Sequence, residues 1–82
     1  MPHHDVVLPD LGFEDEPIVL CQWLVKRGGR VARGDPLLEV LAASAVVDLP
    51  APRDGVLREV LVAEDERVRP GQRLGVIAWD DR

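Results

Sequence analysis

Short apolar segments alternate with turn-forming residues along the whole chain, and this pattern predicts an all-β protein. Seven glycines and seven prolines separate runs rich in Val, Leu and Ile. No stretch repeats apolar residues at helical spacing for three turns. The predicted strands cover residues 6–8, 18–26, 37–42, 45–49, 56–62 and 74–79. Two shorter strands are expected around Val31 and Val68.

The chain also contains an internal repeat. Residues 24–40 (LVKRGGRVARGDPLLEV) match residues 61–77 (LVAEDERVRPGQRLGVI) when the sequence is shifted by thirty-seven positions. The identical pairs are Leu24/Leu61, Val25/Val62, Arg30/Arg67, Val31/Val68, Gly34/Gly71 and Leu37/Leu74. Two halves with the same order of strands and turns predict a pseudo-two-fold flattened sandwich or barrel. We expect each half to supply one long strand to each of two sheets.

A tight hairpin over residues 41–46 is expected at one end of this fold. The chain turns back on itself after Val40, whereas the equivalent segment after Ile77 simply ends. The termini should therefore lie at the opposite end. Loop tips on rigid scaffolds commonly carry function, so Ser44 and its neighbours Ala43 and Ala45 are candidate site residues.

Composition narrows the classes of function. A length of 82 residues predicts a single domain over residues 1–82. Ten basic and fifteen acidic residues give a net charge of −5, which argues against nucleic acid and anionic membranes as partners. No signal-peptide pattern or spanning apolar run is present, so we expect a cytoplasmic protein. Nine of the ten basic residues are Arg, and Lys26 is the only lysine.

Five sequence blocks resemble the lipoyl domain family. They cover nearly the whole chain, and the spacing between them is the same as in that family. They are LPDLG (8–12), LCQWLVKRGGRV (20–31), GDPLLEV (34–40), DLPAPRDGVL (48–57) and VRPGQRLGVI (68–77). The resemblance implies two four-stranded antiparallel sheets with quasi-two-fold symmetry, the barrel-sandwich hybrid. It also implies a relationship to the swinging-arm carriers in acyltransferase components of 2-oxo acid dehydrogenase complexes.

The attachment site of that family is altered in this chain. The family joins lipoate to a lysine at the hairpin tip, usually preceded by Asp, whereas this chain has Ser44 between Ala43 and Ala45. Biotin carriers place the lysine between two methionines, and this chain has only Met1. A serine hydroxyl gives an ester and not the amide, and Lys26 is expected at the opposite pole. We therefore predict that Ser44 is unmodified and that lipoate, biotin and other cofactors are absent.

Catalytic and metal-binding interpretations of other residues are weaker. Ser44 has no His or acidic partner nearby in sequence, so we expect a small turn residue and no enzyme. His3 and His4 are consecutive strand residues that point to opposite faces, so no metal site is expected. We expect Cys21 to be a buried apolar residue. Trp23 and Trp79 are expected in packing roles.

An acidic loop is the other candidate contact surface. Its predicted partner-contact residues are Asp10, Leu11, Gly12, Phe13 and Glu14, together with Ala43 and Ala45 of the hairpin. The resemblance places this loop beside the hairpin, where partner enzymes distinguish one lipoyl domain from another. A merely solvated loop is an equal alternative, and an exposed Phe13 would favour binding.

These observations favour a lipoyl-domain-like module that lacks the lipoyl-lysine and acts through protein contacts. Its expected partners are proteins, among them components of 2-oxo acid dehydrogenase complexes. The alternative is a genuine lipoyl or acyl carrier domain of such a complex whose lysine is substituted or diverged in this chain.

Overall fold

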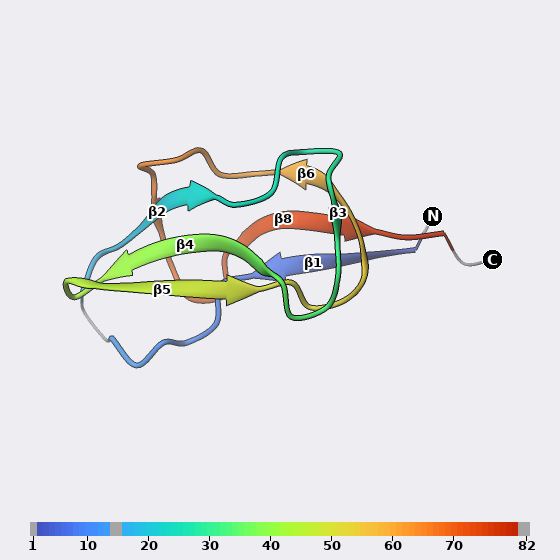
Figure 1. The fold of residues 1–82 in the computed structure, drawn as a ribbon. Helices are drawn as coiled ribbons and strands as arrows, with labels where there is room; N and C mark the ends of the chain where they lie inside the picture. Colours follow the sequence, from blue (N-terminus) through green and yellow to red (C-terminus); the bar gives the residue numbers. More distant parts are fainter. Residues whose placement is uncertain (1, 14–15, 81–82) are drawn as a thin grey trace.

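A computed structural model describes residues 2–13 and 16–80, and within them the chain forms eight β-strands and no helix (Figure 1). The strands are β1 (His3–Val7), β2 (Ile18–Trp23), β3 (Arg30–Val31), β4 (Pro36–Ala42), β5 (Ala45–Pro50), β6 (Gly55–Val60), β7 (Arg67–Val68) and β8 (Arg73–Ala78). They build two four-stranded antiparallel sheets of order β1-β8-β6-β3 and β5-β4-β2-β7. The predicted all-β fold of two four-stranded sheets is confirmed.

The sequence repeat is visible in the strand pairing. β2, β3 and β4 of the first half correspond to β6, β7 and β8 of the second, thirty-seven positions later. In β2 the register with β4 shifts between Leu20 and Gln22, and in β6 the register with β8 shifts between Leu57 and Glu59. The same β-bulge therefore occurs once in each half, at Cys21 and at Arg58.

The distribution of strands between the sheets differs from the sequence prediction. Both long strands of the first half, β2 and β4, lie in one sheet, and both long strands of the second half lie in the other. Only the short strands β3 and β7 cross to the opposite sheet. The reason is that the chain reverses after β2 and returns to pair directly with it, so that Ile18 lies opposite Ala42.

Three predicted strand boundaries were wrong by two residues or more. β2 ends at Trp23 and not at residue 26, because the chain then turns toward the other sheet, where Gly28 N donates to Leu57 O at 2.7 Å. β6 ends at Val60 for the equivalent reason, since Asp65 N donates to Leu20 O. β1 begins at His3, because its polar first residues pair with β8.

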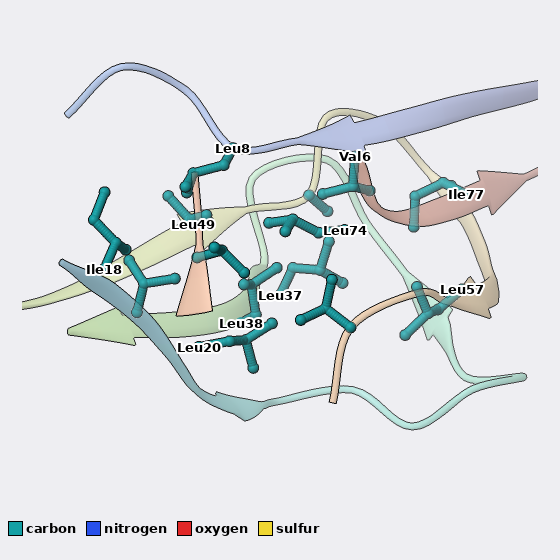
Figure 2. Close-up of a cluster of buried hydrophobic side chains, with 14 of the residues drawn as sticks. Val6, Leu8, Ile18, Leu20, Leu37, Leu38, Leu49, Leu57, Leu74 and Ile77 are labelled. Carbon is teal, nitrogen blue, oxygen red and sulfur yellow. The ribbon is translucent and has the colours of Figure 1, made fainter. Parts of the chain in front are cut away.

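The core between the sheets is aliphatic. No polar or charged described residue is buried. Figure 2 shows the cluster, with leucines from both sheets pointing toward one another. The largest fully buried side chains are Leu8, Leu20, Leu37, Leu38, Leu57, Leu74, Ile77 and Val40. Several are pseudo-equivalent pairs, so the repeat supplies the two facing halves of the core.

Trp23 packs against the edge of this core, whereas the ring of Trp79 stacks with the Arg53 guanidinium. Trp23 is half-buried, and its Nε1 donates to Val62 O at 3.0 Å, in agreement with the expected packing role. Its ring lies over Gly75, where an added Cβ would come within 3.0 Å of Trp23 Cη2. Cys21 is half-buried at the bulge, and the expectation of a buried thiol was wrong. Strand alternation places Cys21 on the face opposite to the buried Leu20, as it does Val19.

The molecule is elongated, with extents of 43 × 20 × 19 Å. The turn between β4 and β5 occupies one end of the long axis, whereas β1 begins and β8 ends at the other (Figure 1). The described part of the chain has no helix suited to crossing a membrane.

Candidate functional site: the hairpin tip and its flanks

The hairpin tip consists of two residues, Ala43 and Ser44, between β4 and β5. The flanking pair Ala42 and Ala45 closes the ladder. Ala43 has φ 48° and Ser44 has φ 67°, so both lie in the left-handed region. A two-residue loop with positive φ at both positions has the backbone sign pattern of a type I′ turn, which normally selects Asn-Gly. For other residues this conformation costs about 1–2 kcal/mol each, so the tip carries backbone strain.

Ser44 has no chemical partner at this tip. Its side chain is exposed, and its Oγ makes no hydrogen bond with another described residue. His3 and His4 lie opposite Ala78 and Ile77 at the far end of the other sheet. Within residues 2–13 and 16–80, no base is therefore hydrogen-bonded to the hydroxyl to activate it, as nucleophilic catalysis requires. The described residues contain no group of three or more His, Cys, Asp or Glu able to hold a metal ion.

Lys26 lies away from the hairpin tip. It belongs to the turn after β2, where its carbonyl accepts a bond from Gly29 N at 2.8 Å. The tip adjoins the opposite end of β2, because Ile18 pairs with Ala42, whereas Trp23 pairs with Leu38. Lys26 is the only lysine in the chain, so no lysine amine lies at the tip.

An exposed apolar row next to the tip was not predicted from the sequence. Val19, Leu41 and Val46 are cross-strand neighbours on the outer face of one sheet. Leu41 is 40% exposed and Val46 is 62% exposed. The signal was available in the alternation of β4, where inward Val40 and buried Ala42 leave Leu41 on the outer face.

The next row along the same face is polar and acidic. Gln22, Glu39 and Asp48 are cross-strand neighbours, and Gln22 Nε2 donates to Glu39 Oε1. Partial desolvation and the adjacent Glu39 carboxylate raise the pKa of Asp48 above its ordinary value of 3.8. The apolar row is therefore bordered by carboxylates on the side away from the tip.

The predicted contact loop borders a shallow cavity of about 770 Å³. Asp10 Oδ1 accepts a bond from Gly12 N at 2.8 Å, and Gly12 has φ 81°, so this segment is a defined turn. The residues lining the cavity include Leu11, Phe13, Ile18 and Val68. Since Ile18 pairs with Ala42, the cavity lies at the tip end of the sheet.

Phe13 is half-buried against the core, so the exposed Phe that would favour binding is not found. Leu11 packs in the same way. Asp10 and Gly12 are exposed, as are Ala43 and Ala45 at the tip. Glu14 lies outside the described residues. The contact role of these residues stays a prediction.

Comparison with known families agrees with this architecture. The family model described as "Biotin-requiring enzyme", which represents biotinyl and lipoyl domains, matches residues 4–77. The chain belongs to the biotinyl/lipoyl domain family. The match includes the hairpin with Ser44 and nearly all of both sheets.

The curated relatives are components of 2-oxoglutarate and pyruvate dehydrogenase complexes. The succinyltransferase component of the Haemophilus influenzae 2-oxoglutarate dehydrogenase complex is 35% identical over 90% of this chain and 18% of its own length. The acetyltransferase component of the Corynebacterium glutamicum pyruvate dehydrogenase complex is 36% identical over 93% and 11%. The protein X component of the Chaetomium thermophilum pyruvate dehydrogenase complex is 35% identical over 72% and 14%. This lipoyl-family chain thus spans less than a fifth of each of these relatives.

Proposed function

We propose that this chain is a non-lipoylated protein-interaction module that binds a component of a 2-oxo acid dehydrogenase complex. The observation that carries the proposal is the hairpin tip. A lipoyl-family scaffold presents Ser44 there. The only lysine, Lys26, lies in the turn that follows the opposite end of β2. The relatives are components of such complexes, which supports the choice of partner.

The chemistry of attachment supports the absence of lipoate. Amide formation with an activated carboxylate needs an amine on a stem long enough to reach the ligase site. Ser44 has a short hydroxyl, and its neighbours Ala43 and Ala45 have methyl groups alone. No base of the described part of the chain is hydrogen-bonded to Ser44, which supports a binding role and no catalytic one.

The flanks of the tip supply a surface for protein contact. Val19, Leu41 and Val46 form an exposed apolar row with Glu39 and Asp48 beside it. Apolar area with a polar border is typical of protein interfaces. We infer that a partner covers this row and the adjacent loop cavity, while the tip itself makes no covalent bond.

Intact-mass measurement tests the missing modification. The chain is coexpressed with a lipoate ligase in the presence of lipoate, beside the double variant Ala43→Asp/Ser44→Lys. We expect the unmodified mass for the natural chain and a lipoyl adduct on a fraction of the double variant. A lipoyl adduct on the natural chain would contradict the proposal. Lys26→Arg then shows whether Lys26 carries it.

A binding measurement tests the contact surface. Calorimetric titration uses the 2-oxo acid decarboxylase component from the same organism as the fixed partner. Val46→Lys should abolish or strongly weaken binding, because it places a charge in the apolar row. Val7→Lys is the matched control, since Val7 is 43% exposed on β1 of the other sheet. Equal affinity of the natural chain and Val46→Lys would remove this surface from the proposal.

A further inference from the structure

Two equivalent turns of the molecule carry opposite charges. Residues 24–29, which follow β2, include Lys26 and Arg27 and no acidic residue. Residues 61–66, which follow β6, include three consecutive acidic residues and no basic one. Arg27 and Glu64 are related by the thirty-seven-residue repeat. The backbone symmetry is therefore combined with a reversal of charge, and we call these segments the basic turn and the acidic turn.

Both turns lie along the same side of the molecule (Figure 1). Trp23 joins them, because its Nε1 donates to Val62 O at 3.0 Å and its backbone N donates to Glu64 Oε2 at 3.1 Å. The acidic turn extends toward the end with the hairpin tip, and the basic turn extends toward the end where β1 begins. A single surface therefore presents both charges, one toward each end.

Neither turn is neutralised by its own surroundings. Lys26 and Arg27 form no ion pair with another residue of the described chain, and neither do the three carboxylates of the acidic turn. Arg58 and Glu59 of β6, the strand next to the basic turn, have opposite charges and do not change the balance. The arginines that follow the two turns stand at equivalent positions in β3 and β7, so they do not offset the difference.

This arrangement of charge limits the kind of partner that can cover both turns. Such a partner must present an acidic group to the basic turn and a basic group to the acidic turn, at the same spacing. A second copy of this chain meets the requirement when it is rotated by 180° about an axis that lies in the interface and passes between the two turns. Each acidic turn then faces the basic turn of the other copy. A rotation about the line that joins the two turns would place like charges opposite one another, which disfavours it.

Exposed leucines add apolar area to the charged turns. The basic turn begins with Leu24 and the acidic turn begins with Leu61, and both side chains are exposed. Surface ion pairs alone contribute little free energy, so apolar contact beside them favours association. The net charge of −5 repels two copies, but salt at about 0.1 M screens this repulsion beyond about 10 Å. The contacts between the turns therefore determine whether two copies associate.

We propose that this chain forms a two-fold homodimer through the basic turn and the acidic turn. Arg27 of each copy pairs with Glu64 of the other, with the adjacent charges of both turns beside them, and the exposed leucines supply apolar contact. The dimer goes beyond the binding role proposed above and does not depend on it. It uses neither the hairpin tip nor the exposed apolar row, so it presents two copies of each to other proteins.

Sedimentation equilibrium at increasing protein concentration, in salt at about 0.1 M, tests this proposal. We expect the natural chain to reach the dimer mass, and no larger species, at millimolar concentration. Arg27→Glu and Glu64→Arg should each weaken dimerisation by about tenfold or more, because each places like charges opposite one another. An equimolar mixture of the two variants should dimerise again, since every turn then faces the opposite charge. A purely structural role of either side chain would not restore association on mixing.

A matched charge reversal outside the two turns is the control. Arg69→Glu changes the net charge as much as Arg27→Glu does, at an exposed residue beyond β7, and it should weaken dimerisation by less than about threefold. Urea unfolding shows that each variant is folded. A natural chain that stays monomeric at millimolar concentration would overturn the proposal, as would equal weakening by Arg69→Glu or a mixture that stays monomeric. Loss of the dimer in Val46→Lys but not in Arg27→Glu would assign the interface to the apolar row instead.

Discussion

Gly28 and Asp65 occupy the same position in the two halves of the molecule and make the same hydrogen bond. The amide of Gly28 donates to Leu57 O and the amide of Asp65 donates to Leu20 O, both at 2.7 Å. Gly28 has φ 89° and Asp65 has φ 71°. Each bond links a turn to the bulged strand of the opposite sheet. The fold therefore requires a left-handed residue at this point twice, and only the first half has glycine there.

We predict opposite effects on stability for substitutions at these two positions. Gly28→Ala should destabilise the protein by about 1 kcal/mol, because alanine is strained at this φ. An added Cβ has no atom within 4 Å, so a steric clash does not contribute. Asp65→Gly should stabilise the protein, because glycine adopts this φ without strain. The expected gain is only about 0.5 kcal/mol, since Asp tolerates the left-handed region better than most residues. Urea unfolding monitored by tryptophan fluorescence measures both changes.

Ala63→Gly controls for the flexibility that any glycine adds to the unfolded chain. Ala63 is exposed in the same turn and has no positive φ, so this variant should lose stability. If Asp65→Gly destabilises the protein as much as Ala63→Gly does, the strain at Asp65 is not the determining factor.

The repeat made most of this architecture predictable. A match between residues 24–40 and 61–77 carries the order of turns and strands, and it aligns Gly28 with Asp65, which both have positive φ in the structure. The repeat does not predict which sheet each strand joins, because the pattern of apolar and polar residues in a strand is the same in either sheet. The bulges at Cys21 and Arg58 were also missed, because a bulge depends on the register between two strands.

The strained turn at the tip leads to a second prediction. Ala43→Asn/Ser44→Gly installs the sequence that a type I′ turn favours and should stabilise the protein by about 1 kcal/mol. For a domain of this size, that corresponds to a rise in Tm of about 4–8 °C. Calorimetry measures the change. Ser44→Val should act in the opposite direction, because a β-branched residue is poorly tolerated at positive φ.

The Asn-Gly variant also distinguishes the backbone strain of the tip from its capacity to be lipoylated. If Ala43→Asn/Ser44→Gly leaves Tm unchanged, the left-handed conformations at Ala43 and Ser44 carry no significant strain. The variant offers no side-chain amine, so it should stay unmodified in the presence of a lipoate ligase, as the natural chain should.

The candidate site was only partly predictable. The position of Ser44 followed from the phase of the repeat, because the hairpin must lie where the first half reverses. The half-burial of Phe13 did not, since the path of a long loop depends on the cavity that it covers. A pocket at the pole opposite the tip was not predicted, because Arg30, Arg53 and Trp79, which line it, are distant in sequence and are brought together by the pairing of β3, β6 and β8.

Two aspartates at equivalent places have different neighbours. Asp5 on β1 lies opposite Val76 and forms an ion pair with Arg73 at 3.1 Å. Asp48 on β5 lies opposite Glu39, which takes the position of Val76 in the other half. One carboxylate thus has a cation beside it, and the other has a second carboxylate.

We predict that Asp48→Asn stabilises the protein at neutral pH and has no such effect in acid. Desolvation and Glu39 raise the pKa of Asp48 in the folded state above 3.8. The folded state therefore binds more protons than the unfolded state just above pH 3.8, and stability falls as pH rises through the raised pKa. Asparagine has no carboxyl group to ionise, so Asp48→Asn removes this fall in stability. Urea unfolding midpoints should differ at pH 7 and converge below pH 3.8. Asp5→Asn should give no gain at pH 7, because it removes an ion pair, and an equal gain from both variants would contradict the role of Glu39.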